Sequence, residues 1–258
     1  MQRASATTRA ARPSSWAARS RSRENWFFGG SIAYEHSDFD ADAGLGTVNG
    51  DNAMLGLVLK RQSGQWLFAG AIDAGYGWYD SKRSVAFDTG TASGSLEGQH
   101  AGLHGRIAYS VPLAEWYFKP YVDFEAVYLR TAGYAERGGG PLALNVASSD
   151  DAFVAASPML ETGGQVRLDR QTMLMPFVSL GGIFYNRNQW TTQARLAGSS
   201  PGVAPFEMVS RLPTEMLKLN VGTSLAIGHN VELKAEYDGE FGGMFRSDAA
   251  TLKLDYLF

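Results

Sequence analysis

Four histidines are the side chains in this 258-residue chain best suited to acid–base or metal chemistry. His100 and His104 share one face of an alternating segment, but a strand would separate their backbones by about 13 Å, too far for one metal ion. His36 precedes Asp38 and could form a dyad with it, although a solvated loop is the simpler interpretation. His229 falls in a short turn. We therefore predict no catalytic residue, no metal site and no cofactor.

The composition excludes other classes of function. The chain has no cysteine, so disulfides and thiolate metal sites are ruled out. It contains neither the G-x-S-x-G pattern of hydrolases nor a phosphate-binding P-loop. A net charge of −3 argues against a nucleic-acid partner. These features together predict a protein that is not an enzyme.

An alternation of apolar and polar residues organises the chain from Asn25 onward, and period two is the signal of a β-strand. The clearest example is the segment from Trp66 to Trp78, in which every second residue is apolar, aromatic or glycine. Ten such segments are predicted as strands: 25–36, 52–61, 65–79, 98–111, 116–130, 152–168, 172–185, 214–228, 231–241 and 248–258.

The lengths of these segments and of their connections favour a membrane barrel. The strands run to about 11–15 residues, whereas strands of soluble proteins average five or six. Turns of about three residues alternate with loops of about fifteen or more, the long ones covering 37–52, 81–98, 131–151 and 186–213. Transmembrane barrels have short periplasmic turns and long extracellular loops. We therefore predict an all-β fold, a transmembrane antiparallel up-and-down β-barrel, over a soluble barrel or lipocalin-like fold.

The residues on the two faces of the strands also favour a membrane barrel over a soluble one. The apolar faces begin or end with aromatic residues, as expected for rings at the membrane interface. The predicted interfacial aromatics are Trp26, Tyr34, Trp66, Trp78, Tyr109, Trp116, Tyr128 and Tyr237. The opposite faces carry charges of both signs, which predicts a hydrated lumen or a plugged one, without strong ion selectivity. The predicted lumen residues are Lys119, Asp123, Glu125, Glu161, Arg167, Lys218, Glu232, Lys234, Glu236, Lys253 and Asp255.

Residues 1–24 differ from the rest of the chain. They carry six arginines among Ala, Ser and Thr, with Glu24 as the only acid. An apolar core of seven or more residues is missing, so no secretory signal can be read there. We predict a disordered Arg-rich extension over 1–24 and a barrel domain over 25–258.

Two motifs make the chain similar to the autotransporter β-domain family. The run Glu236–Gly243 contains Y-D-G-E-F-G, and Trp116–Tyr121 resembles the W-x-L-x-P-Y segment of the family. The resemblance implies a twelve-strand barrel of the bacterial outer membrane that exports an N-terminal passenger by type V secretion. Ten strands are predicted here, so the first two strands and the passenger are expected to be absent. Ten is an even number, so closure as a smaller barrel remains open.

The resemblance also implies that the barrel-assembly machinery recognises the last strand. The predicted signal alternates apolar residues and ends on an aromatic: Ala250, Leu252, Leu254, Tyr256 and Phe258. Strand addition to a sheet edge would supply the affinity. The expected partners are outer-membrane lipid, that machinery and a passenger polypeptide. A channel or structural barrel without a passenger, and an outer-membrane hydrolase, are the alternatives.

Overall fold

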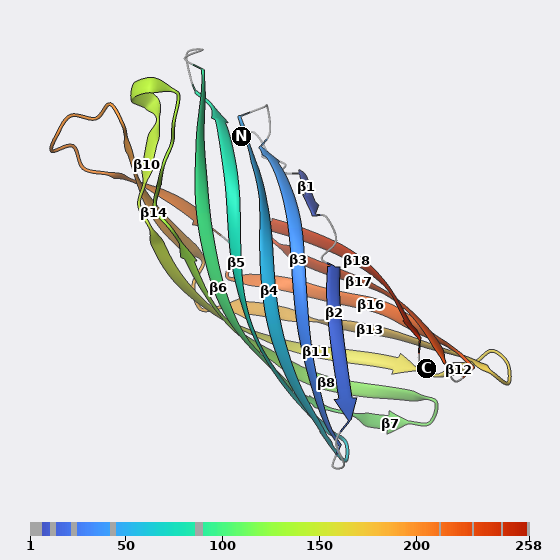
Figure 1. Ribbon diagram of the computed structural model, residues 1–258. Coiled ribbons are helices and arrows are strands. Elements are labelled where there is room, and N and C mark those ends of the chain that lie inside the picture. The colour runs from blue at the N-terminus through green and yellow to red at the C-terminus, as the bar shows by residue number, and fades with distance from the viewer. Residues whose placement is uncertain are drawn as a thin grey trace.

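The computed structural model describes residues 7–10, 14–21, 25–41, 45–85, 90–211, 213–228, 230–243 and 245–256, the first two ranges by their backbone only. Most of these residues belong to one curled antiparallel sheet, and a smaller four-stranded sheet lies at one end of it (Figure 1). The all-β architecture predicted from the alternation is confirmed.

Ten long strands follow one another around the large sheet in chain order, each antiparallel to the next. They are β3 (Trp26–Ala41), β4 (Gly46–Ser63), β5 (Trp66–Ser84), β6 (Thr91–Tyr109), β8 (Trp116–Thr131), β11 (Ser149–Gly164), β13 (Thr172–Tyr185), β16 (Glu215–Ile227), β17 (Val231–Gly242) and β18 (Phe245–Tyr256). Each corresponds to one predicted strand. The short strands β7 (Val111–Leu113) and β12 (Val166–Arg167) pair beside turns with β8 and β13. Among the described residues the sheet is open, because its order runs from β1 to β18 without a pairing that joins the two ends.

The segment before Asn25 contains two strands where the sequence predicted a disordered extension. Strands β1 (Thr7–Ala10) and β2 (Ser14–Arg21) both pair antiparallel with β3. Strand β3 would otherwise expose a row of backbone donors and acceptors at the sheet edge, and pairing satisfies them. Backbone pairing of this kind needs no apolar alternation, which is why the composition did not reveal it.

The strands on the long-loop side extend further than predicted. The polar residues 37–52 and 81–98 were expected to form loops, but β3 runs to Ala41 and β4 starts at Gly46, while β5 runs to Ser84 and β6 starts at Thr91. The apolar alternation stops where a strand leaves the apolar band, yet the backbone ladder continues. The predicted strands that correspond to β3, β4, β5 and β6 were therefore several residues too short on this side.

A second sheet replaces the other two predicted loops. It is ordered β15 (Phe206–Arg211), β14 (Gln189–Leu196), β10 (Leu144–Val146) and β9 (Tyr134–Ala135), with the 3-10 helix η3 (Gly140–Leu142) between β9 and β10. Arg83 at the end of β5 holds it in place, since its guanidinium donates to both carboxylate oxygens of Glu136 at 3.1 and 2.6 Å and to the carbonyl of Leu142.

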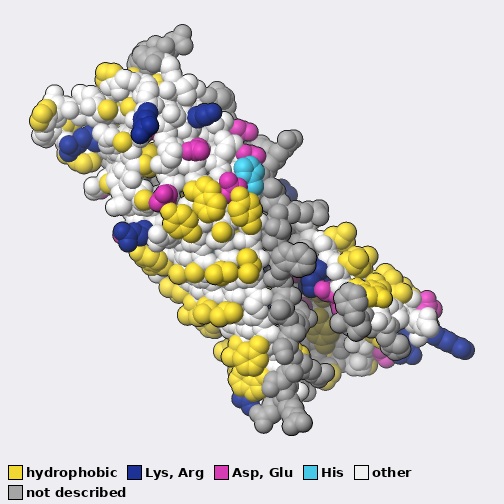
Figure 2. Space-filling model, in the orientation of Figure 1, with side chains coloured by type: hydrophobic (Ala, Val, Ile, Leu, Met, Phe, Trp, Pro, Cys, Tyr) yellow, Lys and Arg dark blue, Asp and Glu magenta, His cyan; other side chains and the backbone are white. Residues whose placement is uncertain are grey.

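The distribution of polarity is the reverse of that in a soluble protein. Ser157 and Ser179 are among the most buried side chains, and Asp123 and Glu161 are buried as well. Leu57 on β4 and Leu254 on β18, by contrast, are 62% and 67% exposed. Figure 2 shows apolar side chains gathered in rows across the middle of the outer face, with charged side chains mainly beyond these rows. Exposed apolar area of this extent marks a surface that contacts lipid or protein. No helix in the described part of the chain is long and apolar enough to cross a membrane.

Candidate functional site

The inner face of the large sheet carries most of the charged side chains that the alternation assigned to the lumen. On β8, the odd-numbered positions point inward, and Lys119 lies directly opposite Glu161 of β11 in the register. The two side chains form an ion pair, and the Tyr117 hydroxyl donates to Glu161 Oε1 at 2.7 Å. Both contacts fall on Oε1 of this carboxylate, whose side chain is only 9% exposed.

Arg106 on β6 is an interior residue that the predicted set omitted. Its guanidinium donates to Asp123 on β8 through Nε at 2.5 Å and Nη2 at 2.8 Å, and lies over the Tyr121 ring at 4.3 Å. Tyr121 in turn shares a hydrogen bond of 2.7 Å with Ser179. The signal for Arg106 was present in the sequence, because it shares the polar face of its strand with His100 and His104.

The opposite wall contributes a second charged group. The Asn220 amide on β16 donates to Glu236 Oε1 on β17 at 2.7 Å, and Lys234 forms an ion pair with the same carboxylate at 2.6 Å. Lys218 lies 3.6 Å from Glu240. A cavity of about 370 Å³ separates this wall from the other, and its lining includes Arg106, Lys119, Glu161, Asn220, Lys234 and Glu236.

A larger cavity lies between the first and the last long strands. Its volume is about 980 Å³, and its lining includes Glu232, Lys253 and Asp255 of the predicted set together with Lys60 and Asp73. Lys253 and Asp255 form an ion pair at 2.8 Å. Nine of the eleven predicted lumen residues thus lie in ion pairs or line these two cavities.

The other two predicted lumen residues are placed differently. Glu125 is partly buried on the inner face of β8 and lines a small cavity of about 190 Å³ with His104, Arg106 and Asp123. Arg167 is exposed on the two-residue strand β12, beside a turn, and lines neither of the larger cavities.

The predicted aromatic residues lie on the outer face in two levels. Near the short turns, Trp66 packs against Tyr109 with ring centroids 4.9 Å apart; at the other level, Tyr34 lies 6.4 Å and Tyr76 6.1 Å from Trp78. Trp116 and Tyr128 end the outer face of β8 and are 53% and 44% exposed, and Trp26 and Tyr237 are partly buried. On β5 the distance from Trp66 to Tyr76, measured along the membrane normal, is about 23 Å for strands tilted by 45°. This matches the apolar band of about 25 Å in outer-membrane barrels.

The histidines do not form a metal centre within the described residues. His100 and His104 nevertheless converge, since their Nε2 atoms lie 3.3 and 2.7 Å from the two carboxylate oxygens of Asp73 on the neighbouring strand. His36 belongs to β3 rather than to a loop, and its Nδ1 lies 2.8 Å from Asp51, while Asp38 is 3.6 Å from Nε2. His229 lies outside the described residues.

Four of the five residues of the predicted assembly signal lie on β18, the last strand of the sheet order. Ala250, Leu252, Leu254 and Tyr256 alternate along the outer side of β18, with Leu252 and Leu254 about two-thirds exposed, at 65% and 67%. Strand β18 pairs only with β17 within the described part of the chain. Phe258 lies outside the described residues.

Three autotransporter domains of known structure have a fold similar to that of this chain. The chain superimposes on the translocator domain of the autotransporter NalP from Neisseria meningitidis with a TM-score of 0.79 and 15% identity, covering 98% of this chain and 82% of that one. The beta domain of the Bordetella autotransporter BrkA gives 0.62 and 16% identity, covering 94% and 87%. The transport unit of AIDA-I from Escherichia coli gives 0.59 and 12%, covering 98% and 84%.

Sequence comparison gives the family. A search of curated proteins found no match. The family model of the autotransporter beta-domain, however, matches residues 17–238, which is most of the chain and includes the long strands from β3 to β16. The resemblance stated from the Y-D-G-E-F-G motif is thereby confirmed. The chain belongs to the autotransporter beta-domain family, whose members are translocator barrels of the Gram-negative outer membrane.

Proposed function

We propose that the polar interior of this barrel is the route by which an N-terminal passenger polypeptide crosses the outer membrane. The observation that carries the proposal is the pairing of interior charges with one another, as in Lys119 with Glu161 and Arg106 with Asp123. A hydrated wall whose charges are already paired has little tendency to hold a passing chain of either sign.

Surface display tests this proposal. A signal peptide and an epitope-tagged passenger are fused before the chain, and the tag is probed on intact cells by antibody and by external protease. Export places the tag outside in a form that the protease removes. A correctly inserted barrel whose tag stays in the periplasm would instead support the passenger-less channel. The matched control replaces β18 by a scrambled strand of the same composition, which should abolish both insertion and display.

We also propose that the barrel-assembly machinery recognises Ala250, Leu252, Leu254, Tyr256 and Phe258. The free edge of β18 and its exposed alternate residues support this, because strand addition combines backbone pairing with side-chain selection. Removal of Phe258 should lower the fraction of chain assembled in the outer membrane and leave the unfolding of the assembled fraction unchanged. Normal assembly of the shortened chain would refute the role of the terminal aromatic.

We further propose that the barrel has no enzymatic activity. The His36–Asp51 contact lies on strands whose side chains are exposed at the end of the long loops, and neither side chain contacts a Ser nucleophile within the described residues. His36→Ala should leave protease and lipase activity of purified barrel at the level of a detergent blank. Activity in the wild type that is lost in His36→Ala would overturn the proposal.

We assign interfacial anchoring to Trp26, Tyr34, Trp66, Trp78, Tyr109, Trp116, Tyr128 and Tyr237, and the barrel domain to residues 25–258. The two aromatic levels support the first assignment. The ten long strands that follow one another from β3 to β18 support the second, with β1 and β2 pairing onto β3 before them.

A further inference from the structure

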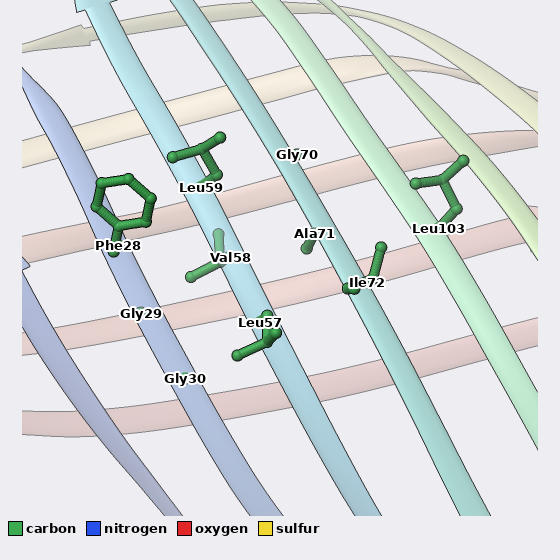
Figure 3. A pocket seen from close by; sticks show the side chains of 10 residues that line it. All are labelled: Phe28, Gly29, Gly30, Leu57, Val58, Leu59, Gly70, Ala71, Ile72 and Leu103. Atoms are coloured by element: carbon green, nitrogen blue, oxygen red, sulfur yellow. The ribbon is translucent and has the colours of Figure 1, made fainter.

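A hollow interrupts the apolar outer face over strands β3, β4 and β5. Its volume is about 660 Å³, and Phe28, Leu57, Leu59, Ile72 and Leu103 form its walls. Figure 3 shows these side chains around a floor in which Gly30 and Gly70 have none. The register places Gly30 opposite Leu57 and Leu59 opposite Gly70, so the glycines leave gaps between the leucines. The hollow is thus created by the sequence of the outer face.

The position of the hollow determines what can fill it. It lies between the level of Trp66 and the level of Tyr76 and Trp78, within the apolar band that faces hydrocarbon. Gly70 on its floor is four residues from Trp66, at the level of the short turns, and six residues from Tyr76, at the other aromatic level. Short turns are periplasmic, so the hollow lies in the periplasmic leaflet, where phospholipid tails are available.

The cationic side chain of Arg61 lies on the same face as the hollow, on the side of the short turns. Arg61 follows Leu57 and Leu59 on the outer side of β4, and the register places it between Trp26 of β3 and Phe68 of β5. Its side chain is exposed, and its guanidinium lies 5.0 Å from the Trp26 ring. Arg61 is about 13 Å along the strand from Leu57, or about 9 Å along the normal of a 45° strand. When the phosphate of a phospholipid binds Arg61, the first carbons of its acyl chain therefore lie at the opening of the hollow.

We propose that this face is a binding site for one anionic phospholipid of the periplasmic leaflet, with an acyl chain in the hollow and the phosphate at Arg61. Arginine suits the phosphate because its planar guanidinium can donate two parallel hydrogen bonds. An acyl chain in the hollow is stabilised by dispersion contacts with the apolar walls, and these contacts are lost when the hollow is unfilled. The site depends on insertion into the membrane but not on export of a passenger.

Native mass spectrometry of the full chain tests the site. The barrel is reconstituted with equal amounts of phosphatidylglycerol and phosphatidylethanolamine, extracted in mild detergent and analysed for retained lipid. We expect one phosphatidylglycerol per chain, retained at a detergent concentration that removes other lipid. Gly70→Leu should lower its occupancy at least tenfold, because the new side chain fills the floor. A Cβ at Gly70 would meet nothing closer than the His104 carbonyl at 3.9 Å, so this variant should fold.

Two further variants make the test decisive. Ala74→Leu adds the same side chain to the same face of β5 outside the hollow, and should retain the lipid. Arg61→Gln should keep a lipid in the hollow but lose the preference for phosphatidylglycerol over phosphatidylethanolamine. Retention of equal lipid by Gly70→Leu, or annular lipid only in the wild type, with no defined stoichiometry, would overturn the proposal. Surface display of a passenger by Gly70→Leu remains a separate measurement, so failure of the lipid site and failure of export are distinguishable.

Discussion

Arg106 and Asp123 face each other across strands β6 and β8, and the guanidinium holds both carboxylate oxygens at 2.5 and 2.8 Å. The Asp123 side chain is 12% exposed and the Arg106 side chain 41%. The pair therefore joins a nearly buried carboxylate to a cation that still reaches the interior water.

Asp123→Ala should destabilise the assembled barrel by about 1.5–3 kcal/mol, the range for hydrogen bonds that involve charged groups. Arg106 would lose its partner at the centre of the interior wall. The urea midpoint of the folded band, read from gel migration without heating, measures the change. Asp150→Ala is the matched control, because Asp150 pairs with Arg130 at 3.7 Å with both side chains more than half exposed. The control should cost less than about 1 kcal/mol, and an equal effect of the two variants would contradict our account.

Glu161→Ala should be more damaging than Glu161→Gln. The alanine variant leaves Lys119 without its partner, at a cost of about 3 kcal/mol for a buried pair, and also leaves the Tyr117 hydroxyl without its acceptor. Glutamine keeps an oxygen for Tyr117 and loses only the charge. The same urea midpoints test the order, and a larger effect of the glutamine variant would contradict the geometry described.

Leu252→Arg on the outer side of β18 should destabilise the inserted barrel by about 1–3 kcal/mol, since a cation between the bilayer midplane and the interface costs between the values for those two depths. Leu252 is 65% exposed on the apolar face. Its neighbour Thr251 points to the interior side, opposite Glu236, so Thr251→Arg is the matched control. The control should insert normally into liposomes. Equal insertion of the two variants would mean that this side of β18 does not face lipid.

The Asp169 carboxylate should make one periplasmic turn sensitive to acid. The backbone N–H groups of Gln171 and Thr172 donate to Asp169 Oδ1 at 2.7 and 2.8 Å, and the Gln171 hydrogen bond in particular lowers the pKa of this carboxyl. A lowered pKa means that the stabilisation is present above the ordinary pKa of an aspartate and is lost as the pH falls through the folded-state value. Asp169→Asn should therefore be less stable than the wild type at pH 7, and the difference should vanish in strong acid. A difference that grows with acidity would reverse the sign and refute the assignment.

The ten long strands could be predicted because one side of each strand faces hydrocarbon and the other faces the hydrated interior, which forces apolar and polar residues to alternate. The alternation starts and stops in the sequence where the strand enters and leaves the membrane. The ends at the first short turn, Ser63 and Trp66, were predicted to within two residues, because a short turn leaves little freedom. The long-loop ends of β3 to β6 were not, because polar strand residues such as Asp38 and Asn49 pair in water through their backbone and carry no periodic signal.

For the interior ion pairs, the sequence predicted which face of the strand each residue occupies but not which residues pair. Alternation places Lys119 and Glu161 on the inner side, but which charges meet depends on the register between strands, which the sequence does not reveal. The convergence of His100 and His104 on Asp73 was missed for a related reason. The backbone spacing of the histidines is too large for direct contact, and only a third residue on the adjacent strand brings their rings toward a common point.

The continuation of β5 and β6 past the aromatic level at Trp78 sets where the interior meets the outside. Strand β5 runs six residues further to Ser84, which raises the wall about 14 Å above the outer aromatic ring at a tilt of 45°. The Arg83–Glu136 contact ties the smaller sheet to this extension. The wall of the barrel therefore continues beyond the apolar band on the long-loop side. A polypeptide that passes through the barrel emerges above the lipid headgroups, where its first free residues can begin to fold without touching the membrane.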